Sequence, residues 1–307
     1  MIELKNTIKK FDSYTALDGV SLSIERGTAF GLLGSNGAGK STILRLLSGI
    51  YRPEGGEVMI DGESVYDNPA IKQKVFFIND ETVQFGSYTL AKLRDFYKSF
   101  YPNFSDEMFE SLRQKVKLPL DKKITTFSKG MKRQAIVIIG LACRTDYLLL
   151  DEAFDGLDPT MRIIVKKMLV DAMLDRQLTT VISSHNLKEI NEVCDTAALL
   201  HQGKIIFSRE IDSIKSSIHK IQAVFQKNAD GTPAQLTAED FPGLEILHFE
   251  RSQSIYYIIA KGDEETIRNE LAPKEPALVE LIPLTLEEVF IYELEVLGYD
   301  SSDITAE

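Results

Sequence analysis

One nine-residue segment constrains the fold more than any other part of the chain: it reads Gly34-Ser35-Asn36-Gly37-Ala38-Gly39-Lys40-Ser41-Thr42. It matches the pattern Gly-x-x-x-x-Gly-Lys-Ser/Thr, in which glycines let the backbone turn tightly and direct its N–H groups at phosphate oxygens. The apolar run Thr28 to Leu33 predicts a buried strand before it, and the run Thr42 to Leu47 predicts a helix after it. A chance match to the four fixed positions is expected in only about one chain in a hundred of this length. The flanks lower that figure further, so we expect a nucleoside triphosphate to bind between strand and helix.

The residue types in this loop suit different parts of the ligand. Backbone N–H groups of residues 34–42 and the positive end of the following helix suit the phosphates. Lys40 is expected to reach the β- and γ-phosphates, and the Ser41 hydroxyl is expected to bind Mg²⁺.

Strands and helices alternate after this loop, which predicts an α/β fold with a mainly parallel central sheet. Such sheets bind ligands at the carboxyl ends of their strands. The apolar strand Tyr147 to Leu150 ends in Asp151-Glu152, and the strand Thr179 to Ile182 ends in Ser183-Ser184-His185. We expect Asp151 to hold Mg²⁺ opposite Ser41, and Glu152 to activate the attacking water. The alternative, an exposed acidic pair, does not explain the apolar strand before it or the phosphate loop upstream.

A second helix start is predicted just before the apolar helix Ala135 to Ala142. The segment Phe127-Ser128-Lys129-Gly130-Met131 precedes it, and Ser128 is a favoured N-cap residue. By itself, this anion-suited helix end is a weak signal.

The order of these motifs resembles the ATP-binding subunits of ABC transporters, most of all bacterial export ATPases of the bacitracin-resistance type. The resemblance covers about residues 1 to 210 and includes Gly156-Leu157-Asp158. It implies a P-loop NTPase fold with an antiparallel β subdomain, a helical subdomain at about residues 88–142, ATP with Mg²⁺, and a separate membrane permease. It also implies a dimer, homomeric or heteromeric, with two ATP molecules sandwiched between the copies.

The resemblance assigns further roles residue by residue. Phe11 matches the aromatic residue that stacks on adenine, although a Phe at a strand end can instead be a core residue. Ser128 and Gly130 match positions that contact the γ-phosphate across the dimer. Asp158 matches the segment that links the two sites, and His185 matches the residue that hydrogen-bonds the γ-phosphate.

The chain also departs from the family pattern. The usual Leu-Ser-Gly-Gly-Gln signature has Phe127, Lys129 and Met131 at three of its five positions. One hypothesis is that Lys129 adds a cation near the partner's nucleotide; a solvent-facing lysine is the alternative. Asp80 stands where the family has a glutamine that links magnesium to the permease. Its carboxylate can still bind Mg²⁺ through a water molecule. Gln84 is an alternative match to the family's glutamine, but its distance from the preceding strand fits less well. Nothing in the sequence explains why Ala153-Phe154 replaces the common Pro-Thr.

Composition bounds the remaining possibilities. Residues 221–307 contain 5 Lys/Arg and 18 Asp/Glu, and the whole chain has a net charge of −11. This acidic balance argues against a general nucleic-acid binder. The acidic C-terminal part is either a docking surface or a solvated face. The sequence has no apolar run of about 18 residues, no secretory signal and two cysteines without a pairing motif. We therefore expect a cytoplasmic protein. By the family resemblance, it would bind the inner face of the membrane through its permease.

We expect an ATP-binding domain over residues 1–215 and a small α+β accessory domain over 218–307. Strands are predicted at Ile221 to Phe225, Leu244 to Phe249 and Ile255 to Ala260, and helices at Glu264 to Leu271 and Leu286 to Leu297. Two other functions remain open at this point. One is a soluble ABC ATPase acting on ribosomes or DNA, and the other is a regulatory nucleotide-binding module with little turnover.

Overall fold

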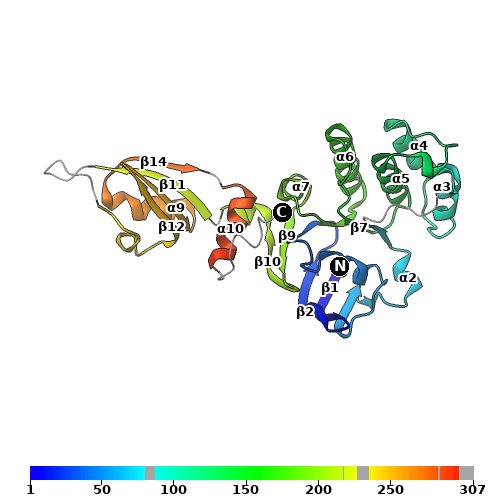
Figure 1. Ribbon diagram of the computed structural model, residues 1–307, viewed down its shortest axis with the longest axis horizontal. Coiled ribbons are helices and arrows are strands. Elements are labelled where there is room, and N and C mark those ends of the chain that lie inside the picture. The colour runs from blue at the N-terminus through cyan, green and yellow to red at the C-terminus, as the bar shows by residue number, and fades with distance from the viewer. Residues whose placement is uncertain (80–86, 217, 227–234, 283, 297–307) are drawn as a thin grey trace. The chain divides into compact units, whose positions relative to one another are not determined.

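Figure 1 shows the computed structural model of the chain, which describes residues 1–79, 87–216, 218–226, 235–282 and 284–296. The chain divides into two compact units, Met1–Ser208 and Arg209–Glu307. This division lies a few residues before the boundary that we expected from the sequence, at 215–218. Among the described residues, no helix has the length and apolar content needed to span a membrane.

The first unit is built on two sheets. An antiparallel sheet has the strand order β2-β1-β4-β5, and a six-stranded sheet has the order β10-β9-β3-β8-β7-β6. In the second sheet, β3 pairs in parallel with β8 and β9, and β7 pairs in parallel with β6 and β8. The predicted antiparallel subdomain and mainly parallel central sheet are therefore confirmed. The strands are β1 (Ile2–Phe11), β2 (Tyr14–Ile24), β3 (Ala29–Leu33), β4 (Gly55–Ile60), β5 (Glu63–Ser64), β6 (Val75–Ile78), β7 (Tyr147–Asp151), β8 (Thr179–Ser183), β9 (Thr196–His201) and β10 (Lys204–Glu210).

Four longer helices of this unit begin at a residue whose side chain caps them. The side chains of Thr89, Ser105, Ser128 and Asp158 each accept a hydrogen bond from the backbone N–H three residues on, at 3.0–3.3 Å. Pro102, which cannot donate a backbone hydrogen bond within a helix, lies between α3 and α4. The helices are α1 (Lys40–Leu47), α2 (Pro69–Lys72), α3 (Leu90–Lys98), α4 (Asp106–Lys115), the short 3₁₀ helix η1 (Ile124–Thr126), α5 (Lys129–Ala142), α6 (Pro159–Arg176) and α7 (Leu187–Val193).

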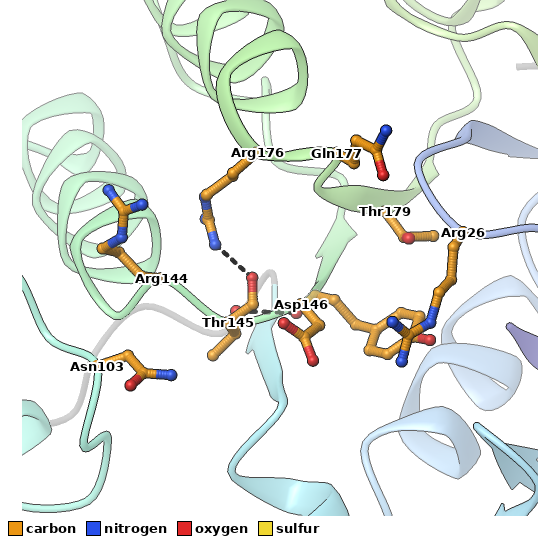
Figure 2. A pocket seen from close by; sticks show the side chains of 9 residues that line it. Arg26, Asn103, Arg144, Thr145, Asp146, Arg176, Gln177 and Thr179 are labelled. Atoms are coloured by element: carbon orange, nitrogen blue, oxygen red, sulfur yellow. Dashed lines mark hydrogen bonds between the residues drawn. The ribbon is translucent and has the colours of Figure 1, made fainter.

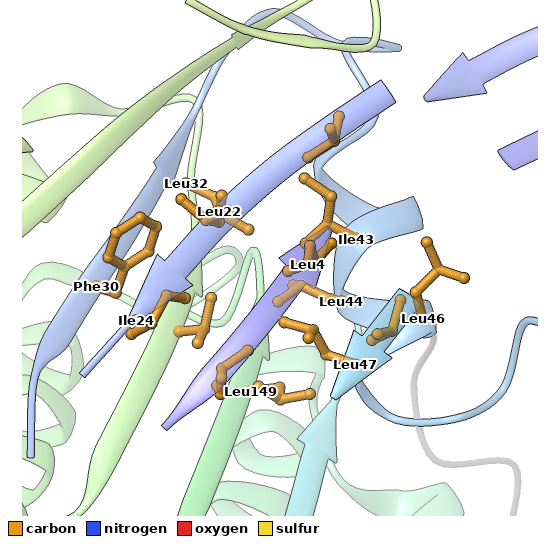
Figure 3. Packing of buried hydrophobic residues seen from close by; sticks show 14 of the residues in the cluster. Leu4, Leu22, Ile24, Phe30, Leu32, Ile43, Leu44, Leu46, Leu47 and Leu149 are labelled. Carbon is orange, nitrogen blue, oxygen red and sulfur yellow. The ribbon is translucent and has the colours of Figure 1, made fainter. Parts of the chain in front are cut away.

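The central strands are apolar along their whole length because both faces of the sheet are covered. Every residue of β3, β7 and β8 is buried, as is typical of parallel strands covered by helices or a second layer. Helix α1 fills the space between the two sheets: it contacts β4 on one side and β7 and β8 on the other. Figure 3 shows Ile43, Leu44 and Leu47 of α1 among the core side chains of both sheets. The core therefore lies directly behind the phosphate loop.

Helix α5 lies unusually close to β6. A Cβ atom at Gly140 would lie 2.8 Å from Phe76 Cδ1, so only glycine allows this approach. At the other end of the contact, the buried Arg133 donates a hydrogen bond from Nη1 to the backbone oxygen of Asn79 at 2.7 Å. The helix that begins at Ser128 is thus joined at two points to the strand that leads toward residue 80.

The second unit is an antiparallel sheet with helices, and its strand order is β12-β13-β11-β14. Helix α10 begins with a capping box, in which Thr285 N donates to Glu288 Oε2 and Glu288 N donates to Thr285 Oγ1. Strand β14 was not predicted: it begins at Pro276, which suits the first residue of an edge strand but weakens the strand signal. The elements are α8 (Ile211–Ser216), β11 (Ile218–Phe225), the 3₁₀ helices η2 (Ala238–Asp240) and η3 (Ala272–Lys274), β12 (Glu245–Ser252), β13 (Ile255–Lys261), α9 (Glu264–Leu271), β14 (Pro276–Ile282) and α10 (Leu286–Val296).

Candidate functional site

The phosphate loop connects the end of β3 to the start of α1, and three of its glycines have positive φ angles. Gly34, Gly37 and Gly39 have φ values of 149°, 79° and 111°. A Cβ atom at Gly34 would lie 2.2 Å from the backbone oxygen of Leu200, and one at Gly39 would lie 2.8 Å from Leu17 Cδ2. Two of the three glycines are therefore required by close packing as well as by backbone conformation.

Lys40 is the first residue of α1, and its side chain lies over the loop. It is 5% exposed, and its Nζ donates hydrogen bonds to the backbone oxygens of Gly34 at 2.6 Å and Ser35 at 3.2 Å. The same Nζ lies 3.9 Å from Glu152 Oε1. A buried ammonium group therefore sits between the phosphate loop and the end of β7.

Asp151 and Ser41 meet as the sequence predicted. The buried carboxylate of Asp151 accepts hydrogen bonds at Oδ1 from Ser41 Oγ at 3.0 Å and from Ser183 Oγ at 2.6 Å. A hydroxyl and a carboxylate are the hard oxygen ligands that Mg²⁺ prefers, so this pair fits the ion. Ser183 was not among the predicted site residues; the only signal for it was its place at the end of the strand next to β7.

Glu152 lies between a cation and an imidazole. Its Oε2 atom lies 3.1 Å from His185 Nδ1, and its Oε1 atom faces Lys40. Burial raises the pKa of Glu152, while the charges of Lys40 and His185 oppose that shift. Glu152 itself has a φ of 47°, and its backbone N–H donates to Ser183. The strand end is thus turned so that this carboxylate points toward the loop side.

Asp155 adds a further carboxylate beside this pair. Its backbone N–H donates to the backbone oxygen of Glu152 at 3.2 Å, and this hydrogen bond closes a tight turn. One ligand atom each from Glu152, Asp155 and His185 lie within 4.8 Å of one another. This nitrogen-containing set suits Mg²⁺ less well than the oxygen pair of Ser41 and Asp151.

Phe11 lies at the end of β1 and is 38% exposed, so it is not a core residue. Its ring packs edge-on against Tyr51 at a centroid distance of 5.3 Å, and Lys9 Nζ lies 5.1 Å from its centroid. Tyr14, which sequence reasoning missed, donates a hydrogen bond from its hydroxyl to the backbone oxygen of Gly37 at 3.2 Å. An exposed aromatic surface therefore borders the phosphate loop.

The signature residues form a separate group at the start of α5. Ser128 caps this helix, and a Cβ atom at Gly130 would lie 3.1 Å from the backbone oxygen of Gly156. The stem of Lys129 also packs on Gly156, shortly before Asp158, which caps α6. In the part of the chain that the structure describes, no hydrogen bond or ion pair joins Ser128, Gly130 or Asp158 to residues 34–42. The predicted Asp80 and its alternative Gln84 lie outside the described residues.

Similar folds occur among solved structures. The ATP-binding subunit of an ABC transporter matches with a TM-score of 0.65 at 24% identity, covering 70% of this chain and 92% of that one. A dimeric ATP-binding cassette in a post-hydrolysis state, bound to ADP and Pi, matches with a TM-score of 0.62 at 20% identity, covering 69% and 99%. These likenesses, with the loop and strand ends described above, define the chain as a P-loop NTPase.

Sequence relatives narrow this class. A family model described as ABC transporter matches residues 17–155. The ABC transporter ATP-binding protein YtrB of Bacillus subtilis is 31% identical, over 95% of this chain and 97% of its own length. The bacitracin transport ATP-binding protein BcrA of Bacillus licheniformis is 29% identical, over 72% of this chain and 73% of its own length. The chain belongs to the ATP-binding proteins of ABC transporters, a family of ATPases.

Proposed function

We propose that this chain hydrolyses Mg-ATP and thereby drives a separate membrane permease. The observation that carries the proposal is the convergence of Lys40, Glu152 and His185 beside the Ser41–Asp151 pair. Two strand ends and one loop, distant in sequence, bring together a cation, a carboxylate and an imidazole. Such a set of groups suits phosphoryl transfer to water better than nucleotide binding alone.

Each group has a defined task in the proposed reaction. Backbone N–H groups of residues 34–42 hold the phosphates, and Lys40 exchanges its contacts with the loop oxygens for the β- and γ-phosphates. Mg²⁺, held by Ser41 and Asp151, would neutralise charge that develops on the phosphates. Adenine stacks on the exposed ring of Phe11.

Glu152 is the proposed general base. The burial that raises its pKa makes it a stronger base than an exposed carboxylate, and the charge of Lys40 opposes that rise. His185 Nδ1 contacts the Glu152 carboxylate, which orients the imidazole for a hydrogen bond to the γ-phosphate. Asp80 is proposed as an additional Mg²⁺ ligand through water.

The second half of the site is proposed to come from another ATPase subunit, either a copy of this chain or a related one. The N-terminal end of α5, with Ser128 and Gly130, would contact the γ-phosphate bound by the partner, and Asp158 would link the two sites. The packing of the Lys129 side chain on Gly156 supports a further step, in which its ammonium group would lie near the partner's nucleotide. Lys129→Gly should then weaken ATP-dependent dimerisation, and unchanged dimerisation would remove Lys129 from the mechanism.

Dimer closure is the proposed mechanical step, and the permease the proposed recipient of that motion. The likeness to BcrA, a bacitracin transport protein, supports export, although relatives also include the methionine import protein MetN of Protochlamydia amoebophila. The chain would then act at the inner face of the cell membrane. Co-purification with a multi-span membrane protein tests the proposed coupling to a permease. A soluble ABC ATPase that acts on ribosomes or DNA would not co-purify with such a protein.

Substitution of Glu152 tests hydrolysis itself. Glu152→Gln should lower steady-state ATP turnover about a hundredfold or more, because it removes the base while retaining the side chain's shape. ATP binding should persist, which equilibrium dialysis with labelled ATP measures. Glu107→Gln, at an exposed position of α4, is the matched control and should keep the native rate.

A second candidate function is a nucleotide-binding module with little turnover. It is favoured by Lys129 and Met131 in the signature. Equal and very slow hydrolysis in the native protein and in Glu152→Gln would support this candidate and refute the proposed ATPase cycle.

A further inference from the structure

A cavity of about 450 Å³ lies at the edge of the central sheet opposite the nucleotide site. Its lining includes Tyr147 and Thr179, the first residues of β7 and β8, whereas Glu152 and His185 follow the other ends of these strands. Figure 2 shows the polar side chains that surround it. Its volume falls in the range of about 300–1,000 Å³ typical of small-molecule sites.

Arginines dominate the charge of this lining. Arg26, Arg144 and Arg176 contribute three guanidinium groups, and Asp146 contributes the one carboxylate among the lining residues. Arg26 is already matched, because its Nε and Nη2 donate to both carboxylate oxygens of Asp61. The other two arginines therefore decide what the cavity can bind.

Arg176 is the last residue of α6, and its guanidinium group is largely buried. Its Nη1 donates to the backbone oxygen of Thr145, but its buried Nε and Nη2 atoms have no hydrogen-bond partner among the described residues. Burial, together with the nearby charge of Arg144, lowers the pKa of Arg176 to about 10. Buried donors of a charged group are rarely left unpaired, since nothing then replaces their lost hydration.

Arg144 follows the C-terminal end of α5, and its guanidinium group makes no hydrogen bond or ion pair with any residue that the structure describes. It has a φ of 50°, and Gln177, which follows α6, has a φ of 51°. Glycine is the favoured residue at such left-handed helix ends. Both helices that end at this cavity instead have a long polar residue at the left-handed position, Arg144 after α5 and Gln177 after α6, and both side chains line the cavity.

A simpler explanation is that these arginines only stabilise helix ends. Cations are favourable near the C-terminal end of a helix, and the Thr145 oxygen is one acceptor of this kind. That explanation accounts for Nη1 of Arg176 but supplies no acceptor for its Nε and Nη2 atoms, and it does not require Arg144 to remain unpaired. An incoming oxyanion would supply acceptors to both side chains.

We propose that this cavity binds a phosphate-bearing small molecule, whose oxyanion group is held by Arg144 and Arg176. Planar guanidinium groups bind phosphate oxygens in pairs. This suits two arginines whose side chains form no ion pair with a carboxylate among the described residues, although the charges of Asp146 and Asp175 act on Arg176. Asn103 and Gln177 supply further polar groups for the remainder of the ligand. The site is distinct from the phosphate loop, and its occupancy does not depend on ATP hydrolysis.

The test is calorimetric titration with inorganic pyrophosphate at constant ionic strength, without divalent cations. The full-length Lys40→Ala variant is the parent protein, because it weakens anion binding at the phosphate loop. Adding Arg144→Gln or Arg176→Gln should weaken binding by about tenfold or more, since each removes charge-assisted hydrogen bonds. Adding Arg268→Gln, which removes an exposed charge in the second unit, should leave binding unchanged.

Two further variants keep the test decisive if Arg176→Gln fails to fold. Arg144→Gly suits the left-handed helix end and should unfold at a temperature no lower than the parent does, yet it should lose pyrophosphate binding. Arg176→Lys keeps a positive charge but loses the forked donors, and it should bind more weakly than the parent. No binding to the parent, or equal binding by the parent and the Arg144 variants, would overturn the proposal.

Discussion

Ser183 is predicted to position the carboxylate of Asp151, the proposed Mg²⁺ ligand. Its side chain is fully buried, and its Oγ donates to Asp151 Oδ1 at 2.6 Å while accepting a bond from Glu152 N at 3.2 Å. Ser183→Ala removes one of the two hydroxyls that donate to Asp151 Oδ1 and leaves the other, that of Ser41. The N–H of Glu152 keeps a second acceptor, the backbone oxygen of Ser183, so the main loss is the bond to Asp151.

The size of the effect follows from that bond. A hydrogen bond to a charged group contributes about 1.5–3 kcal/mol, which corresponds to a factor of about 10 to 150 in an equilibrium constant. Loss of a residue that orients a metal ligand typically weakens metal affinity about 10- to 100-fold. We therefore expect the Mg²⁺ concentration for half-maximal ATP hydrolysis to rise by about 10- to 100-fold in Ser183→Ala.

The assay is steady-state ATP hydrolysis at saturating ATP over a Mg²⁺ titration, with urea unfolding measured in parallel. Ser184→Ala is the matched control, because Ser184 is also buried and donates to a carboxylate, Glu189 Oε2, at 2.9 Å. Both variants should lose stability by similar amounts, but only Ser183→Ala should shift the Mg²⁺ dependence. Identical Mg²⁺ dependence in the two variants would show that Ser183 does not act on the metal site.

Three further predictions concern the phosphate loop, the proposed stacking of adenine on Phe11, and the hydrogen bonds of Asp61. Gly34→Ala should abolish ATP binding in equilibrium dialysis, because its Cβ would lie 2.2 Å from a backbone oxygen, whereas Gly37→Ala, with open space around it, should only weaken binding. Phe11→Ala should reduce affinity for ATP more than for inorganic tripolyphosphate, since only ATP carries a base to stack on the ring; equal losses would rule out stacking. Asp61→Asn should lower the free energy of unfolding by about 2–4 kcal/mol at pH 7, because Asp61 accepts hydrogen bonds from Arg26 and Tyr147. Burial raises the pKa of Asp61, but the hydrogen bonds from these groups outweigh it and hold the pKa well below its usual range. The contribution of Asp61 to stability is therefore complete above about pH 4 to 5 and is lost as the pH falls. Urea unfolding from pH 7 to pH 3 should show a smaller loss of stability in Asp61→Asn than in the native protein.

Much of this site was predictable because its parts carry local signals. The loop from Gly34 to Lys40 has a fixed spacing, and Asp151 follows an unbroken apolar run, so both could be placed on the carboxyl edge of a parallel sheet. Their meeting, through Ser41 Oγ and Asp151 Oδ1, then followed from the fold.

The residues that were missed depend on pairing between distant segments. Ser183 acts on Asp151 only because β8 lies next to β7 in register, which pairs these two residues directly. Tyr14 reaches Gly37 because a hairpin brings it over the loop. Strand β14 was missed for a local reason, since it begins at a proline, Pro276, and another proline, Pro273, stands shortly before it. The cavity lined by Arg144 and Arg176 lies at the ends of two helices and the starts of two strands, and no sequence motif marks it.

The close contact between α5 and β6 limits how the helical subdomain can move. With the Phe76 ring against the bare backbone of Gly140, and Arg133 bonded to Asn79, the helix cannot slide along the strand without breaking both contacts. Any displacement of the N-terminal end of α5, at Ser128, must therefore move β6 as well. A motion of the Ser128 end of α5 would therefore reach β6 and Asn79 directly through these two contacts.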